Sequence, residues 1–369
     1  MRTPFFEELR EKVGKLGGLW NAHLHLCRSG TLDATEELLQ LQREGSHSHL
    51  SISTKHGIIP LIHESDEYSP RRLEERVRYF LDEMVRVGTT TALTLVDVTT
   101  DRVGLSGFDV LQKLKDYYKG SLDLKIGSYS PLGFKDTEKG RWALVERAAV
   151  SADFLGGLPE RDDQKLYPDH IGFEESCRRV LSLSQALGKP LHIHVDQKND
   201  PAERATERVL AVLEQLKIPT PAGEPMTWLI HVISPSAYDD EEFDALVHNL
   251  AQKNVGVICC PSAAISMRQL RFLNTPTHNS MARALEFLAA GIQVRVGSDN
   301  INDITSPAGT ADLIDEMFVF CNAVRFYDLN ILAKIAAGKP LDLVEREKIE
   351  LHLEADRIEI ERSIRFTRQ

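Results

Sequence analysis

Two short apolar segments of the chain carry histidines at alternate positions, a spacing that lets two imidazoles reach one metal ion. His23 and His25 lie in GLWNAHLHL. His192 and His194 lie in LHIHVDQKND. Both segments have the apolar character of strands, in which residues two apart point to the same face. Either pair alone is equally compatible with histidines that are buried and hydrogen-bonded in a core.

Polar residues at the ends of other apolar segments favour the metal interpretation. His231 lies near the end of a predicted strand at 227–233, and Asp299 follows a predicted strand at 293–297. The carboxyl ends of parallel strands meet at one mouth of a barrel. Three imidazoles and a carboxylate suit Zn²⁺ or a similar divalent ion and leave one position open for water. The predicted ligands are His23, His25, His194 and Asp299.

A site of this kind supports hydrolytic chemistry. The ion lowers the pKa of a bound water toward neutral and so supplies a hydroxide nucleophile. Asp299 could bind the ion and also take the proton of the water as general base. His231 could hydrogen-bond the hydroxide or the oxyanion that forms. We expect His192 to lie deeper than His194, as a buried residue and not as a ligand.

Short strands alternate with amphipathic helices along the chain, which is typical of a parallel sheet covered by helices. Helices are predicted at 69–87, 107–118, 142–150, 173–187, 203–216, 239–252 and 280–290. Eight strands are predicted, at 19–26, 90–96, 123–129, 152–158, 190–195, 227–233, 256–260 and 293–297. Eight strands close a (β/α)8 barrel, or TIM barrel. We therefore predict an α/β protein with a single barrel domain over 1–369 and its metal site at the C-terminal mouth.

Three segments are predicted to lie outside the repeating units. A short helix at about 4–13 precedes the first strand. A charged helical extension at about 342–366 is expected to pack on the barrel or on a partner subunit. The connection 27–68 is predicted as a long loop with histidines at positions 47, 49, 56 and 63, and a helix at 34–44 could lie inside it. Loops of this length are often lids or binding loops.

Composition limits the partners of the protein. The chain has 369 residues, a net charge of −11 and a pI near 5.7, which argues against a nucleic-acid or anionic-membrane surface. No apolar run approaches the length of a membrane span, and the N-terminus lacks the apolar core of a signal peptide. Five cysteines without a CxxC spacing favour a cytoplasmic protein, with Cys259 and Cys260 as packing residues. The expected partner is a small-molecule substrate, and formation of a homo-oligomer stays open.

The order of these motifs resembles that of the amidohydrolase superfamily of metal-dependent hydrolases, and the surrounding text looks most like its cytosine deaminase branch. The similarity covers about Leu19–Asp315. It is carried by VDV at 96–98, GGLPERDD at 156–163, HVDQKNDP at 194–201 and GSDNINDITSPAGTAD at 297–312.

The resemblance implies one Zn²⁺ ion, or Fe²⁺, bound by the four residues predicted above, with His231 assisting activation of the water. Family members with two metals use a carboxylated lysine at the end of the fourth strand, and 152–158 contains no lysine. The combination of HxE with PCxxC that marks the other zinc deaminase type is absent, because the sequence contains no PCxxC. The family commonly adds a small β-sandwich, which the short ends of this chain do not predict.

Gln197 departs from the family pattern. The residue three positions after the third histidine ligand is usually a glutamate that carries a proton to the ring nitrogen, and an amide cannot do so at neutral pH. Asp196 could replace it, although its side chain should point the other way if the strand continues. The other predicted substrate-binding residues are Glu160, Arg161, Asp162 and Asn300, with Asp303 as either a pocket or a turn residue.

Three functions remain open. The first is hydrolysis of a C–N bond in a cyclic or linear amide of a small polar, heterocyclic compound, which needs no proton carrier at Gln197. The second is deamination of an amino-substituted ring by a proton route that avoids Gln197. The third is a catalytically inactive barrel that only binds its ligand, which an intact metal set argues against.

Overall fold

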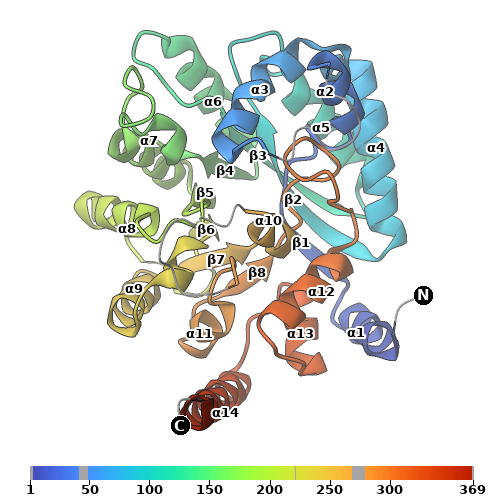
Figure 1. Ribbon diagram of the computed structural model, residues 1–369. Helices are drawn as coiled ribbons and strands as arrows, with labels where there is room; N and C mark the ends of the chain where they lie inside the picture. Colours follow the sequence, from blue (N-terminus) through green and yellow to red (C-terminus); the bar gives the residue numbers. More distant parts are fainter. Residues whose placement is uncertain (1–2, 41–48, 221, 268–278, 368–369) are drawn as a thin grey trace.

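The structure is a computed structural model that describes residues 3–40, 49–220, 222–267 and 279–367. Eight parallel strands follow one another around a barrel in the order of the sequence, which confirms the predicted (β/α)8 fold (Figure 1). The strands are β1 (Leu19–Leu24), β2 (Thr89–Asp97), β3 (Asp123–Tyr129), β4 (Phe154–Gly157), β5 (Leu191–Val195), β6 (Thr227–His231), β7 (Val255–Cys259) and β8 (Val294–Val296).

The barrel closes where the segment after β8 pairs with the end of β1. The backbone N–H of Asp299 donates to the carbonyl of His23 at 2.9 Å, and the N–H of His25 donates to the carbonyl of Asp299 at 3.1 Å. This pairing needs a glycine beside it. A Cβ atom on Gly297 would lie 2.8 Å from both the Cβ and the backbone N of His23, closer than such atoms approach.

Helices surround the barrel, as the alternating pattern predicts (Figure 1). They are α1 (Pro4–Lys15), α2 (Leu32–Leu38), α3 (Ile52–Glu64), α4 (Pro70–Arg86), α5 (Ser106–Tyr118), α6 (Lys139–Ser151), α7 (Phe173–Leu187), α8 (Ala205–Leu216), α9 (Asp240–Gln252), α10 (Pro261–Ile265), α11 (Ala284–Ala289), α12 (Leu313–Ala323), α13 (Leu329–Ala336) and α14 (Leu343–Thr367). Short 3₁₀ turns are η1 (Asp66–Tyr68), η2 (Pro159–Asp162) and η3 (Ser234–Ala237).

The connection 27–68, predicted as a long loop, contains two helices and a 3₁₀ turn instead. The first helix is α2, which ends at Leu38; residues 41–48, where the predicted helix would continue, lie outside the described part of the chain. The second is α3, whose first turn is capped by the Ser51 side chain accepting from the N–H of Thr54. Gly57 and Pro60 lie inside α3, and residues of these types ordinarily interrupt helices, so the sequence pattern concealed it.

A buried hydrogen-bonded cluster fastens α3 to the end of β2. His63 Nδ1 lies 2.7 Å from Asp101 Oδ2, and its Nε2 lies 3.2 Å from Asp97 Oδ2. The hydroxyl of Tyr68 donates to the same Asp97 oxygen at 3.1 Å. Because His63 and Asp97 are fully buried, an imidazolium between two carboxylates satisfies charges that would otherwise be costly to bury.

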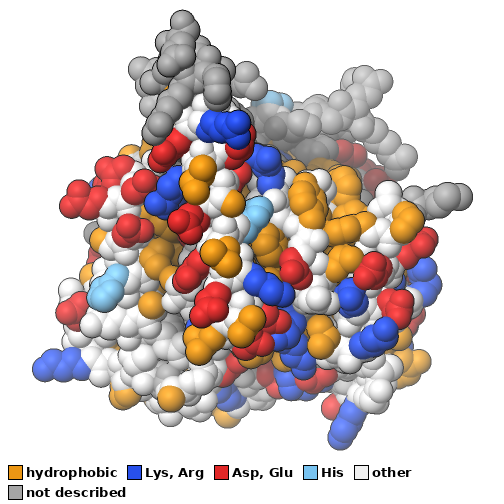
Figure 2. Space-filling model, turned by 90° about the horizontal axis from the view of Figure 1, so that it is seen from below, with side chains coloured by type: hydrophobic (Ala, Val, Ile, Leu, Met, Phe, Trp, Pro, Cys, Tyr) orange, Lys and Arg blue, Asp and Glu red, His pale blue; other side chains and the backbone are white. Residues whose placement is uncertain are grey.

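The far end of the molecule is formed by α14, which packs against α11 through its first turns and buries Ile349. Its later turns expose apolar side chains, among them Leu351 and Ile358. Seen from this side, acidic and basic side chains are mixed with hydrophobic ones (Figure 2). Within the described ranges, none of the helices has the length and apolar character needed to cross a bilayer.

The hydrogen-bonded cluster of His63 with Asp97 and Asp101 predicts that the stability of the fold depends on pH. Burial opposes the charged form, but the hydrogen bonds with Asp101 and Asp97 raise the pKa of His63 to about 9. Its stabilisation is therefore complete below its unfolded pKa near 6.5 and is lost as the pH rises through 9. The free energy of unfolding should fall by roughly 3 kcal/mol across this window. Urea unfolding at pH 6.5 and 9 measures it, and the same fall in a His63→Gln variant would contradict this assignment.

The close approach of Gly297 to His23 predicts that one methyl group added at position 297 lowers the stability of the fold. A Gly297→Ala substitution should push β8 away from β1 and lower the free energy of unfolding by about 1–3 kcal/mol, the usual cost of overpacking. The matched control is Gly140→Ala in α6, where the added methyl group would meet only Thr100 at an ordinary 3.5 Å. Equal stability of the two variants in chemical denaturation would show that the strand approach is not constrained.

Candidate metal centre

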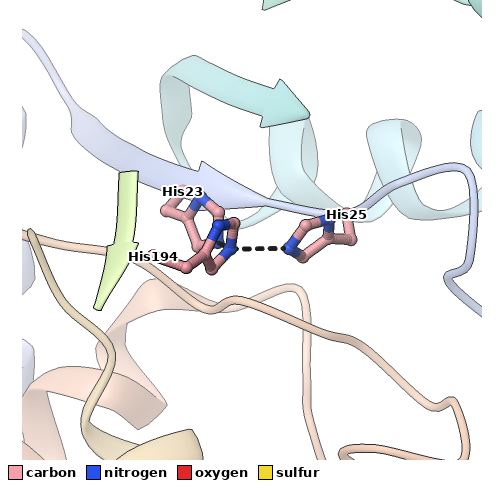
Figure 3. A group of neighbouring side chains, drawn as sticks. All are labelled: His23, His25 and His194. Atoms are coloured by element: carbon pink, nitrogen blue, oxygen red, sulfur yellow. Dashed lines mark hydrogen bonds between the residues drawn. The ribbon is translucent and has the colours of Figure 1, made fainter. Parts of the chain in front are cut away.

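Four side chains from three strand ends converge at the mouth of the barrel. His194 Nε2 lies 3.2 Å from His23 Nε2 and 3.3 Å from His25 Nε2 (Figure 3). Asp299 Oδ1 lies 3.4 Å from His23 Nε2 and 3.5 Å from His25 Nε2. Tetrahedral Zn²⁺ with ligands at about 2.0–2.1 Å has ligand atoms about 3.3 Å apart. These four separations match the spacing that a tetrahedral metal ion requires, and His23, His25 and His194 together form a group that could hold one.

The three histidines of this set are buried, and two of them, His25 and His194, are held in the neutral form. Burial holds the pKa of His25 and His194 well below the usual value. Nδ1 of His194 lies 3.1 Å from the carbonyl of Gly157, and an N–H there would orient Nε2 toward the centre of the group. A neutral imidazole with its lone pair directed inward is the form that binds a metal.

Asp299 is the carboxylate of this centre. Burial alone would raise its pKa, yet the hydrogen bond with His23 and the charges of His231 and His23 hold that pKa below its ordinary value. Its second oxygen, Oδ2, lies 3.9 Å from His231 Nε2. Asn300, a predicted substrate-binding residue, donates from Nδ2 to Oδ1 of Asp299 at 3.0 Å. It therefore contacts one of the predicted metal-binding residues directly.

His231 lies where the sequence predicts it, close to the carboxylate but not among the tightly grouped Nε2 atoms. Burial lowers its pKa to about 4, although the charge of Asp299 opposes that shift. It is therefore neutral at physiological pH and offers one N–H and one lone pair to a bound oxygen. Its backbone has φ +78°, and the next residue, Val232, has φ +50°.

Left-handed backbone recurs at this mouth. Asp196 after β5 and Asp299 after β8 also have positive φ, at +51° and +59°. A β-branched residue such as Val232 rarely adopts this conformation, which costs about 1–3 kcal/mol. Strain of this kind gathers where side chains are held in position for chemistry, and here it marks three strand ends around the histidine group.

His192 lies one layer below the site, as expected. Its ring packs against Phe154 at 4.5 Å between centroids and faces Trp228 at 6.4 Å. These neighbours belong to the apolar cluster that fills the barrel interior. The packing at this level is tight. The Trp228 ring fills the space beside Gly256, where even one added Cβ atom would clash with it.

Three predicted substrate-binding residues line a small cavity at the mouth. Glu160, Arg161 and Gln197 enclose about 30 Å³ together with His56 of α3. A wider groove of about 450 Å³ adjoins it and shares Ser53 and other residues of α3. The inner space holds little more than a water molecule, so α3 closes over the residues that the sequence assigns to the substrate.

Two acidic residues of the predicted pocket anchor loops. Asp162 Oδ1 accepts from the N–H of Phe134 at 2.6 Å and lies 3.1 Å from His170 Nδ1. Asp303 Oδ1 accepts from two backbone N–H groups of its own turn. Asp162 therefore holds two βα loops together through Oδ1, whereas its Oδ2 has no hydrogen-bond partner among the described residues. Its role in substrate binding stays a prediction, and Asp303 is a turn residue.

Sequence reasoning missed three residues close to the centre. His56 was assigned to a loop, but burial, and then the charges of Arg28 and Arg161, lower its pKa to about 3. Tyr129 at the end of β3 lies 5.5 Å from the His25 ring and receives a hydrogen bond from Arg28 at 2.9 Å. The only sequence signals were the position of Tyr129 at a strand end and of Arg28 three residues after His25.

Relatives of known sequence share about three quarters of the chain. No family model matches it. An uncharacterized protein of Haemophilus influenzae is 25% identical over 286 residues, which are 76% of this chain and 94% of the relative. The pterin deaminase of Rhizobium rhizogenes is 20% identical over 286 residues, again 76% of this chain but 62% of the relative.

Solved structures extend the comparison to the fold. A 5-methylcytosine deaminase from Klebsiella pneumoniae superposes with a TM-score of 0.72 and 20% identity, covering 86% of this chain and 72% of that one. N-isopropylammelide isopropylaminohydrolase from Burkholderia multivorans gives 0.64 and 19%, with 87% and 73% covered. The resemblance predicted from the motifs is borne out at the level of the fold, which the chain shares with these two enzymes.

Proposed function

We propose that this protein is a metal-dependent hydrolase that cleaves a C–N bond in a small polar heterocycle. The observation that carries the proposal is the donor set at the mouth of the barrel. The separations of His194 and of Asp299 from His23 and His25, 3.2–3.5 Å, are close to the edge of a Zn²⁺ tetrahedron. An enclosed carboxylate beside neutral imidazoles has no purpose in apolar packing, because burying it uncompensated is costly.

The proposed cofactor is one divalent metal ion, with Zn²⁺ as the first choice and Fe²⁺ as the alternative. Bound by His23, His25, His194 and Asp299, it would acidify a water molecule at the open position. Asp299 is placed to accept a proton from that water. His231, neutral and 3.9 Å from Asp299 Oδ2, is placed to hydrogen-bond the oxygen that attacks the substrate.

Two reactions fit this machinery. Hydrolysis of a cyclic or linear amide is the simpler, because Gln197 carries no proton. Deamination of an amino-substituted ring is supported by the pterin and 5-methylcytosine deaminases among the similar proteins. Ammonia separates the two, since ring opening of an amide yields a carboxylate and no ammonia.

Two further expectations from the sequence, self-association and a cytoplasmic location, are also proposals. Self-association is supported by the exposed apolar residues of α14, Leu351 and Ile358 among them. A cytoplasmic location is supported by the five cysteines, all of which are free thiols, as is usual in a reducing compartment. The nucleic-acid and membrane surfaces that the net charge disfavours are not part of the proposal.

Metal binding should stabilise the fold. Protein stripped with a chelator should gain about 2.7 kcal/mol of unfolding free energy when Zn²⁺ is added at roughly 100 times its dissociation constant. His194→Ala should lose this gain together with bound zinc measured by mass spectrometry. The control is His248→Ala on the exposed side of α9, which should behave like the parent; zinc retained by His194→Ala would contradict the ligand assignment.

Turnover should be found with a panel of 5-methylcytosine, pterin, N-isopropylammelide and the cyclic amide hydantoin. Asp299→Asn should reduce kcat/KM by about 10²–10⁴-fold, since it loses the group that moves the proton of the water. Ammonia, isopropylamine and ring opening are measured separately. A zinc-loaded protein that binds these compounds but converts none would favour the inactive barrel.

A further inference from the structure

Position 197 has a glutamine where the resemblance leads us to expect a proton-carrying glutamate, and the carboxyl group of Glu160 lies beside it. Glu160, in η2 directly after β4, extends across the mouth toward the end of β5. Its Oε2 accepts from Nε2 of Gln197 at 3.3 Å, and its Oε1 accepts from the backbone N–H of Asp196 at 2.7 Å. Two hydrogen bonds from neighbouring residues therefore hold this carboxyl in one orientation, beside the amide that cannot carry a proton.

Asp196, the other nearby acid, is committed elsewhere. Its Oδ1 accepts from the N–H of Ala205 at 2.8 Å, and its Oδ2 accepts from the N–H and the hydroxyl of Thr206. The carboxylate thus caps the first turn of α8 and is fully buried behind β5. It cannot reach the substrate side without uncapping that helix, which removes the alternative that the sequence left open.

The same cavity contains both members of the Glu160–Gln197 pair and His56. The pair follows β4 and β5, which are adjacent strands of the barrel, and β5 carries the predicted ligand His194. A substrate positioned over the metal ligands would therefore meet Glu160 and Gln197 from one side. Gly157, in the same β4–η2 segment as Glu160, contacts the ligand His194, so this segment links the carboxyl to the centre.

We propose, on the basis of the proposed function, that Glu160 replaces the missing glutamate at position 197 as the proton carrier of the reaction. In this chain the acid comes from the segment after β4 and the amide from the segment after β5. Gln197 positions Glu160 and can bind the substrate through its free carbonyl oxygen.

The proton balance of deamination follows directly. As the oxygen of water bonds to the ring carbon that bears the amino group, the electron pair of the C=N bond moves to the ring nitrogen, which takes the proton of the Glu160 carboxyl. Asp299 transfers one proton of the water to the amino group, which leaves as ammonia. The remaining O–H proton returns to Glu160 as the carbonyl forms, so both acids are regenerated.

The groups that face Glu160 agree with a carboxyl that is protonated near neutral pH. Burial, and then the neighbouring carboxylate of Glu203, raise its pKa to about 8, while Lys198 opposes the shift and Asp196 adds to it. Arg161 and His56 line the rest of the cavity, and His56 is neutral. A carboxyl with a pKa near the working pH can both donate and recover a proton.

The experiment compares zinc-loaded wild type with Glu160→Gln on the panel member that is converted. The variant should lose about 10²-fold or more in kcat with little change in KM, since Gln retains an oxygen for the N–H of Asp196. The basic limb of kcat/KM, expected near pH 8, should vanish. In Glu203→Gln that limb should move to lower pH, and Glu160→Gln combined with Gln197→Glu should recover activity.

Infrared spectroscopy adds a readout that needs no substrate. At pH 7 the wild type should show a protonated carboxylic acid band that Glu160→Gln lacks and Glu203→Gln weakens. Activity of Glu160→Gln within about threefold of wild type, or a wild type without that band, overturns the proposal even if the enzyme is active. Failure of every panel compound in the wild type would instead remove the proposed function, and this inference with it.

Discussion

The backbone pairing between residue 299 and the end of β1 is the constraint on which the rest of the structure depends. It closes the barrel, because β8 is short and reaches β1 through these two hydrogen bonds. The same residues carry three of the four donor side chains, so closure of the barrel and assembly of the centre are one event. Gly297 permits the approach by having no side chain at the crossing.

Electrostatics explains why this arrangement suits a cation. The imidazoles of His25 and His194 are kept neutral by burial, whereas Asp299 stays ionised. An ionised carboxylate therefore lies beside two neutral imidazoles in a region closed to solvent, where charges interact strongly. A divalent ion would compensate this charge and leave a net positive centre that activates water. Apolar packing alone provides no such compensation.

Much of this site could be predicted because its residues follow local rules. The β/α alternation alone is enough to predict where two kinds of residue lie: histidines two apart on a strand, and an aspartate at a strand end. The α3 helix was missed, since Gly57 and Pro60 suggest a break and its fixation comes from His63 contacts with distant Asp97 and Asp101. The position of Glu160 against Gln197 depends on which segments become neighbours around the barrel, and so does the contact of Asp162 with Phe134.

The covering helix α3 belongs to the connection between β1 and α4, outside the hydrogen-bonded ladder of the barrel. It reaches the mouth with His56 and Ser53 and is attached to the scaffold at its other end through His63. The helix that covers the mouth and the strand ends that carry the predicted metal ligands are therefore separate parts of the chain. A lineage could alter the length or sequence of this insertion and so change the cover of the mouth, while the strand ends with the predicted ligands stay untouched.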